Sequence, residues 1–147
     1  MPNKKPKIYL AGSMAGRITK EVIAERKKAM KICRKYGMAP LDPGYTELSD
    51  WTGYRISDSM SKAKMAKYVD KDLKLIRRAD GLIKLTGDKA SDGTDYEKDY
   101  AKFIGLPVAI VAPARHKGQL MGFSNVLFPI FPTMKAAFRW LQKECAK

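Results

Sequence analysis

Short apolar segments alternate with amphipathic segments along the chain, and this alternation limits the possible folds more than any other feature. The apolar segments predict strands at Lys7–Ala11, Met38–Asp42, Gly81–Thr86 and Pro107–Ala112. Strands separated by helices in this way form parallel sheets with helices packed on both faces. We therefore expect an α/β fold: one Rossmann-like domain over residues 1–147, with a doubly wound, mostly parallel sheet flanked by helices in three αβα layers.

Residues at helical spacing predict the helices between these strands. The first helix begins near Arg17–Lys20, stops at Gly37 and has an apolar face made of Ile18, Val22, Ala29, Met30 and Cys33. The second ends at Arg78–Ala79 and repeats Ala63, Ala66, Val69, Leu73 and Ile76. The third begins at about Glu97, after a polar loop that starts at Ser91, and stops at Gly105. The last is capped by Thr133 and directs Met134, Ala137, Phe138, Leu141 and Cys145 inward.

The chain carries 29 Lys and Arg residues against 15 Asp and Glu residues, a net charge of +14. Such an excess favours anionic partners, either nucleic acid or phosphorylated small molecules. The basic residues fall on the polar faces of two predicted helices: Lys20, Arg26, Lys27, Lys31, Arg34 and Lys35, then Lys62, Lys64, Lys67, Lys71, Lys74, Arg77 and Arg78. No nucleic-acid motif accompanies them, so we favour solvated helix faces over a nucleic-acid surface.

The sequence offers little for metal or redox chemistry. Cys33 and Cys145 are the only cysteines, and both are expected to be buried thiols because neither has a neighbour at metal or redox spacing. His116, the only histidine, lies in a basic loop, so a multi-histidine metal centre is excluded. No apolar run reaches the roughly 18 residues of a membrane span, and no signal peptide is evident. We expect a soluble cytoplasmic protein without a metal or cofactor.

The carboxyl ends of the strands gather the loops that follow them around one cleft. The turn Gly12–Arg17 offers backbone N–H groups and the Ser13 hydroxyl, an arrangement that binds phosphate or carboxylate groups. Glu97 is expected at the start of a helix, where the dipole favours a carboxylate that acts as nucleophile or base. With Asp72 as a second carboxylate, the residues point to chemistry at a sugar anomeric carbon. In the alternative interpretation both carboxylates are ordinary charges, one at a helix start and one on the surface.

Four segments resemble motifs of the nucleoside 2-deoxyribosyltransferase superfamily, which includes the 2'-deoxynucleoside 5'-phosphate N-hydrolases. They are Ile8-Tyr9-Leu10-Ala11-Gly12-Ser13-Met14-Ala15-Gly16-Arg17, Asp72-Leu73-x-x-Ile76-x-x-Ala79-Asp80, Ser91-x-Gly93-x-x-Tyr96-Glu97-x-x-Tyr100-Ala101 and Gly105-x-Pro107-Val108. The resemblance covers nearly all of the chain. It implies that Glu97 is the nucleophile at C1' of the deoxyribose, that Tyr9 positions the glutamate and the sugar, and that Asp72 assists departure of the base.

The resemblance also implies the residues that bind the substrate: Gly12, Ser13, Met14, Ala15, Gly16, Arg17, Ser91, Gly93 and Asn125. The turn and Ser91 look like the hydrolases, in which they face a 5'-phosphate. Asp92 and Asp95 depart from the pattern, because they add negative charge where small or neutral residues are common. We therefore expect hydrolysis of a 2'-deoxynucleoside 5'-monophosphate, with base exchange by a transferase as the first alternative and a non-catalytic nucleotide or nucleic-acid binder as the second.

The family further implies a homodimer or larger assembly in which a late segment of one subunit closes the neighbour's site. Gly122–Val126 matches that segment by position, and Asn125 resembles a transferase residue that helps bind the substrate. The apolar run Val126–Phe131 fits burial against a partner or in its own core. The segment Tyr45–Ser61, with Trp51 and Tyr54, fits either a binding loop that helps to choose the base or a surface excursion.

Overall fold

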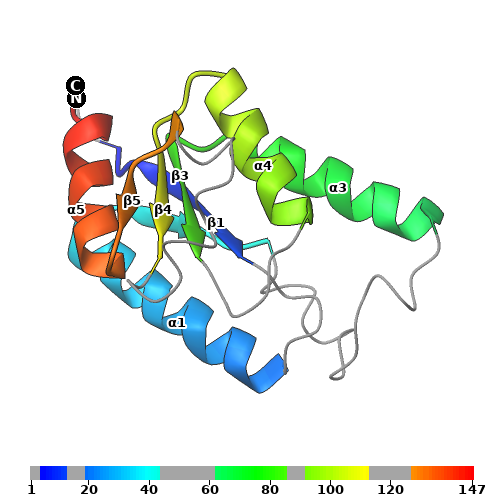
Figure 1. The fold of residues 1–147 in the computed structure, drawn as a ribbon, viewed down its shortest axis with the longest axis horizontal. Helices are drawn as coiled ribbons and strands as arrows, with labels where there is room; N and C mark the ends of the chain where they lie inside the picture. The colour runs from blue at the N-terminus through cyan, green and yellow to red at the C-terminus, as the bar shows by residue number, and fades with distance from the viewer. Residues whose placement is uncertain (1–3, 13–18, 44–61, 86–91, 113–126) are drawn as a thin grey trace.

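Five parallel strands form one sheet in the order β2-β1-β3-β4-β5 (Figure 1). The computed structural model describes residues 4–12, 19–43, 62–85, 92–112 and 127–147. The strands are β1 (Lys7–Gly12), β2 (Ala39–Leu41), β3 (Gly81–Leu85), β4 (Val108–Val111) and β5 (Ile130–Phe131). The chain leaves β1 toward one edge of the sheet to form β2 and then crosses back to form β3. The order therefore reverses between β1 and β3, and such switch points are where α/β sheets bind ligands.

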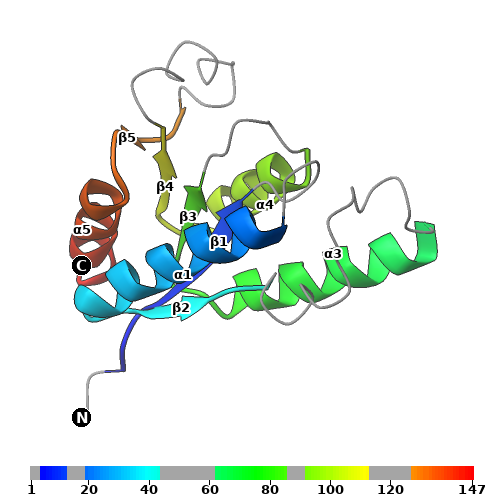
Figure 2. The ribbon, with the colours of Figure 1, turned by 90° about the horizontal axis from the view of Figure 1, so that it is seen from below.

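Two helix layers cover the sheet (Figures 1 and 2). The helices are α1 (Thr19–Lys35), α3 (Lys62–Arg77), α4 (Asp92–Phe103) and α5 (Met134–Cys145). Residues of α1 and α5 pack with Ile8, Leu10, Ile83 and Val111 on one face of the sheet. Residues of α3 and α4 pack with Tyr9, Leu82 and Ile110 on the other. The predicted three-layer α/β fold is confirmed.

The strands are buried on both faces, as parallel sheets between helix layers require. All residues of β3 and β4 are buried, and so are the four central residues of β1. The apolar runs that predicted these strands have no polar alternation for the same reason. Strand β2 is shorter than the predicted Met38–Asp42, and only Ile130 and Phe131 of the late apolar run form a strand.

Glycine and threonine set the helix ends that the sequence predicted. Gly37 and Gly105 adopt positive φ angles of 77° and 90° directly after α1 and α4, a conformation that costs other residues roughly 1–2 kcal/mol. The hydroxyl of Thr133 accepts a 3.2 Å hydrogen bond from Ala136 N at the start of α5. Helix α5 buries Ala137, Phe138 and Leu141 as expected.

Helix α3 differs from an ordinary surface helix, because its apolar stripe is covered only toward the C-terminal end. Ile76 is fully buried and Leu73 half-buried, but Ala63 and Ala66 are exposed and Val69 is 46% exposed. In Figure 2 the N-terminal half of α3 extends beyond the sheet. The helical period was correct, and among the described residues of that half Ala63, Ala66 and Val69 are exposed.

Burial corrects some sequence-based expectations. Arg26 was expected on a solvated face but is 2% exposed, whereas Lys27, Lys31 and Arg34 of the same helix are exposed. Cys33 is buried as predicted and Cys145 is only half-buried. In the late apolar run Phe128 packs in the chain's own core, and Leu127 is 62% exposed. Within the described ranges no helix is both long and apolar enough to cross a membrane.

Candidate functional site

Tyr9 and Glu97, separated by 88 residues in sequence, meet on the α3/α4 face of the sheet. Tyr9 lies in the middle of β1 with no exposed surface, and its phenol O–H donates a hydrogen bond to Glu97 Oε2. Glu97 itself is half-buried on α4. A hydroxyl that donates to a carboxylate stabilises the charged form of that carboxylate and limits its rotation.

The pKa of Tyr9 lies far above its ordinary value. Burial of the phenol is the main cause, followed by the negative charges of Glu97 and Asp72 and by the hydrogen bond to Glu97, while Arg26 opposes the shift. Tyr9 is therefore a permanent hydrogen-bond donor at physiological pH. The charge of Asp72, which belongs to α3, thus acts on the pKa of the Tyr9 phenol.

Asp72 is half-buried, and its Oδ1 atom is fully enclosed. The structure thus pairs Tyr9 of β1 with Glu97 of α4, and the charge of Asp72 on α3 acts on the same phenol. A carboxylate oriented by a phenol, with a second carboxylate acting on that phenol, suits nucleophilic attack at an electron-poor carbon with acid assistance to the leaving group. The individual roles of the three residues stay predictions.

Helix α4 begins earlier than expected. It starts at Asp92, so Glu97 lies one turn further along rather than in the first turn. Asp92 and Asp95 occupy the first turn instead, where negative charges interact favourably with the helix dipole. The dipole effect falls off within that turn, so the hydrogen bond from Tyr9 is the stronger observed support for an ionised Glu97.

Gly12 ends β1 in a tightly packed position. A Cβ atom on Gly12 would lie 3.3 Å from Arg26 Nη2 and 3.3 Å from the Leu85 carbonyl oxygen, so a larger residue would require a shift. Gly93 is the second residue of α4. The other predicted substrate-binding residues lie outside the described residues: Ser13, Met14, Ala15, Gly16, Arg17, Ser91 and Asn125. So do Tyr45–Ser61, His116 and Gly122–Val126.

Sequence reasoning missed a buried ion pair between α1 and the residue that follows β2. Arg26 Nη1 lies 2.8 Å from Asp42 Oδ1, and the two side chains are 3% and 4% exposed. A signal was available, because Arg26 precedes Ala29 by three residues and Cys33 by seven and therefore shares their apolar face. Asp42 directly follows β2, at the carboxyl edge of the sheet.

Two buried lysines were also missed. Lys98, the residue after Glu97, has no exposed surface, and its Nζ lies 3.5 Å from Asp99 Oδ1 and 4.6 Å from the centroid of the Phe128 ring. Lys84 of β3 is 5% exposed. Lys98 precedes the buried Ala101 by three residues, which is again the spacing of one helix face.

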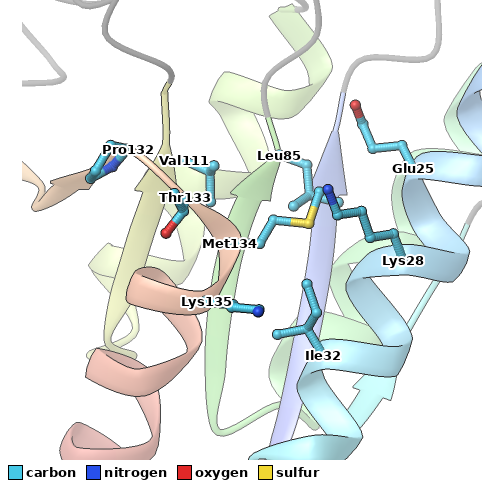
Figure 3. Close-up of a pocket in the computed structure, with 9 residues that line it drawn as sticks. All are labelled: Glu25, Lys28, Ile32, Leu85, Val111, Pro132, Thr133, Met134 and Lys135. Atoms are coloured by element: carbon cyan, nitrogen blue, oxygen red, sulfur yellow. The ribbon is translucent and has the colours of Figure 1, made fainter.

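A pocket of about 420 Å³ lies on the opposite face of the sheet, between α1 and α5 (Figure 3). Ile32, Leu85 and Met134 give it apolar walls, and the side chains of Lys28 and Lys135 extend into the space between the helices (Figure 3). The sheet separates this pocket from Tyr9 and Glu97. Among the described residues no cluster of His, Cys, Asp and Glu could hold a metal ion.

Comparisons with known proteins agree with this architecture. The chain is 22% identical to a 2-deoxyribosyltransferase of Bacillus psychrosaccharolyticus, with a TM-score of 0.65 over 88% of each chain. It is 12% identical to the CMP N-glycosidase BcmB of Clostridium botulinum, with a TM-score of 0.52 over 94% of this chain and 98% of that one. At these identities the two structures show the fold alone.

No curated protein sequence matches the chain significantly. The family model described as nucleoside 2-deoxyribosyltransferase matches residues 8–127, a range that contains Tyr9, Asp72 and Glu97. That range is most of the 147-residue chain. The protein therefore belongs to the nucleoside 2-deoxyribosyltransferase family, whose members are deoxyribosyltransferases and N-glycosidases, enzymes that act on the N-glycosidic bond.

Proposed function

We propose that the protein hydrolyses the N-glycosidic bond of a 2'-deoxynucleoside 5'-monophosphate with Glu97 as the nucleophile. The observation that carries the proposal is the hydrogen bond from the buried Tyr9 phenol to Glu97 Oε2. It orients the carboxylate and stabilises its charged form, as a nucleophile requires. Because Tyr9 stays protonated, the carboxylate keeps this orientation throughout the neutral pH range.

The reaction proceeds in two displacements. A carboxylate oxygen of Glu97 forms a bond to C1' while the C1'–N bond breaks and its electron pair leaves with the base. Asp72 is close enough to the phenol to influence its pKa, and we assign it to assisting base departure. Water then attacks C1', which releases 2-deoxyribose 5-phosphate and restores the carboxylate. In the first step the base gains one proton, which we assign to transfer through Asp72. In the second step water gives its hydroxyl to C1' and its remaining proton returns to Asp72.

The phosphate preference rests on charge and on the loop sequence. The chain has a net charge of +14, and the sequence Gly12–Arg17 predicts a turn with backbone donors and Arg17 for an anion. We assign Ser91 to the same phosphate. One structural neighbour is described as a CMP N-glycosidase, so its substrate is also a nucleoside monophosphate.

Base exchange is the second candidate, because the other neighbour is described as a 2-deoxyribosyltransferase. Both reactions share the first displacement and differ only in whether water or a second base attacks C1'. The discriminating experiment incubates the protein with each deoxynucleoside 5'-monophosphate, with and without a free base, and separates products by liquid chromatography. Free base and sugar phosphate without an acceptor support hydrolysis. New nucleotide that forms only with an acceptor supports transfer.

Glu97→Gln is the matched test of the nucleophile, and Glu144→Gln on α5 is its control. Glu144 lies 2.6 Å from Lys147 at the end of α5, which packs on the opposite face of the sheet from Tyr9 and Glu97. Glu97→Gln should abolish base release while Glu144→Gln retains it. If Glu97→Gln changes no activity and the protein instead binds duplex DNA with a steep salt dependence, the protein is a nucleic-acid binder.

We further propose that the functional unit is a homodimer formed through α3 and α4. Tyr96 is 55% exposed and Phe103 is 88% exposed, and both lie on the outer face of α4 at a spacing of seven residues. Val69 belongs to the exposed stripe on the neighbouring α3. Aromatic side chains each bury about 150–250 Å² when covered. This apolar surface begins at Tyr96, beside Glu97, so a second copy bound there would border the site.

A further inference from the structure

On the side of β1 that faces β2, the hydrogen-bond donors to the β1 carbonyls change halfway along the strand. Ala39 N donates to the Pro6 carbonyl at 2.8 Å, and Asp80 N donates to the Lys7 carbonyl at 2.7 Å on the other side. Because carbonyls alternate along a strand, those of Leu10 and Gly12 face the β2 side like that of Pro6. Strand β2 ends at Leu41, however, before it reaches them.

Pro43 is the reason that the ladder stops. In a parallel ladder the donors on β2 advance two residues for every two on β1, so the donor for the Leu10 carbonyl would be the N–H of residue 43. Residue 43 is proline, which has no N–H. The Leu10 carbonyl therefore requires another donor.

Arg26 supplies it. Its Nη1 donates to the Leu10 carbonyl at 2.7 Å, and its Nη2 donates to the Gly12 carbonyl at 3.2 Å. The same Nη1 lies 2.8 Å from Asp42 Oδ1, which balances the buried charge. A planar guanidinium can span two carbonyls of one strand edge, which an ammonium cannot. The Arg26 side chain thus supplies donors to the β1 carbonyls that lie beyond the last residue of β2.

We infer that Arg26 is a positioning residue for the reaction. It holds the carboxyl end of β1, where Tyr9 precedes one bonded carbonyl and the predicted phosphate-binding turn follows the other. Gly12 keeps room for the guanidinium, since an added Cβ would lie 3.3 Å from Nη2. Loss of the two hydrogen bonds from Arg26 would let the Tyr9 phenol and the residues after Gly12 move relative to Glu97. The inference rests on the proposed function for its kinetic consequence but not for its geometry.

The test compares Arg26→Lys and Arg26→Gln with the same changes at Arg34, which is exposed on the same helix. Lysine retains the charge beside Asp42 but reaches one carbonyl at most. Base release is measured at a temperature where circular dichroism shows every variant fully folded. We expect kcat/KM to fall about 10- to 100-fold in both Arg26 variants, because small misplacement of reacting groups has effects of that size. The Arg34 variants should stay within about twofold of wild type.

A second-site change separates positioning from general stability. Pro43→Ala restores an N–H at the ladder position that faces the Leu10 carbonyl. In the Arg26→Gln background it should recover part of the lost kcat/KM, whereas in the wild-type background it should give no gain. Arg26 variants that keep wild-type kcat/KM and only lose thermal stability would overturn the inference, and so would an absence of coupling with Pro43→Ala.

Nuclear magnetic resonance of the wild-type protein tests the geometry without any variant or activity. A guanidinium held by two carbonyls and a carboxylate gives separate, slowly exchanging Nη signals for Arg26. Averaged signals typical of a freely rotating side chain contradict the inference even if the enzyme is active. Restrained signals in a protein without N-glycosidase activity refute the proposed function alone, which keeps the two failures distinguishable.

Discussion

Replacement of Tyr9 by phenylalanine removes one oxygen atom from the centre of the site and is the most direct test of the proposed chemistry. Tyr9 is fully buried, so no water replaces the lost donor at its position in β1. The ring, which packs in the α3/α4 core, is retained. The change therefore isolates the hydrogen bond to Glu97 Oε2 from the packing of the strand.

The expected size of the effect follows from the kind of bond that is lost. A hydrogen bond to a charged group contributes about 1.5–3 kcal/mol. Because about 1.4 kcal/mol corresponds to a factor of ten in rate, loss of this bond should lower kcat roughly 10- to 150-fold. KM should change little, because Tyr9 acts on the nucleophile and the turn that follows Gly12 is assigned to the phosphate.

The assay is base release from a deoxynucleoside 5'-monophosphate at saturating and subsaturating concentrations. Tyr36→Phe is the control, because it removes a phenol oxygen from the end of α1, where Tyr36 packs against the other core. We expect Tyr36→Phe to retain wild-type kcat. A Tyr9→Phe enzyme with wild-type kcat would refute the assignment of the phenol to orienting Glu97.

Three further predictions concern pH, assembly and a helix end. Burial raises the pKa of the Cys33 thiol to about 12 and that of Cys145 to about 11, above their unfolded value of 9.0. The native state thus holds these protons more tightly than the unfolded state does, and the stability of the protein should fall as pH rises from about 9 to 12. Urea unfolding midpoints measured across this range should fall less steeply for Cys33→Ala than for the wild-type protein. Phe103→Glu should reduce the mass measured by light scattering to that of a monomer and should lower activity with it. Ala24→Glu, which makes the same charge change on the exposed side of α1, should leave both mass and activity unchanged. A Phe103→Glu protein of unchanged mass counts against the α3/α4 interface. Gly37→Ala should lower the free energy of unfolding by about 1 kcal/mol and the Tm by about 2–4 °C. Nothing lies within 4 Å of the added Cβ, so the positive φ of 77° is the only feature that disfavours alanine at this position. An unchanged Tm contradicts this reason.

The layers and helix ends followed from the sequence because each has a local cause. Buried parallel strands need continuous apolar runs, and Gly37, Gly105 and Thr133 stop or start helices through their own backbone or side-chain chemistry. The meeting of Tyr9 with Glu97 came instead from the resemblance to a family. No local pattern predicts a contact across 88 residues, since it depends on how α4 packs over β1.

Polar residues with long-range partners were the ones that sequence patterns misplaced. Arg26 was assigned to a solvated face because of its charge, and the burial of Lys98 was not predicted, while their helical positions relative to Ala29 and Ala101 indicated the buried face. Position was the better guide in both cases. The sequence alone does not reveal the partner of Arg26. Its partners are the Leu10 and Gly12 carbonyls, which β2 leaves without a backbone donor because the strand ends before Pro43.

The position of Asp92 and Asp95 in α4 gives these two acidic residues a local explanation. In a loop, two carboxylates ahead of Glu97 would repel a phosphate. In the structure both belong to the first turn of α4, where the helix N-terminus carries about half a positive charge and such residues contribute about 0.3–1 kcal/mol each. Helix initiation is therefore a sufficient physical reason for acidic residues at these two positions, and they need not be read as a departure that concerns the substrate.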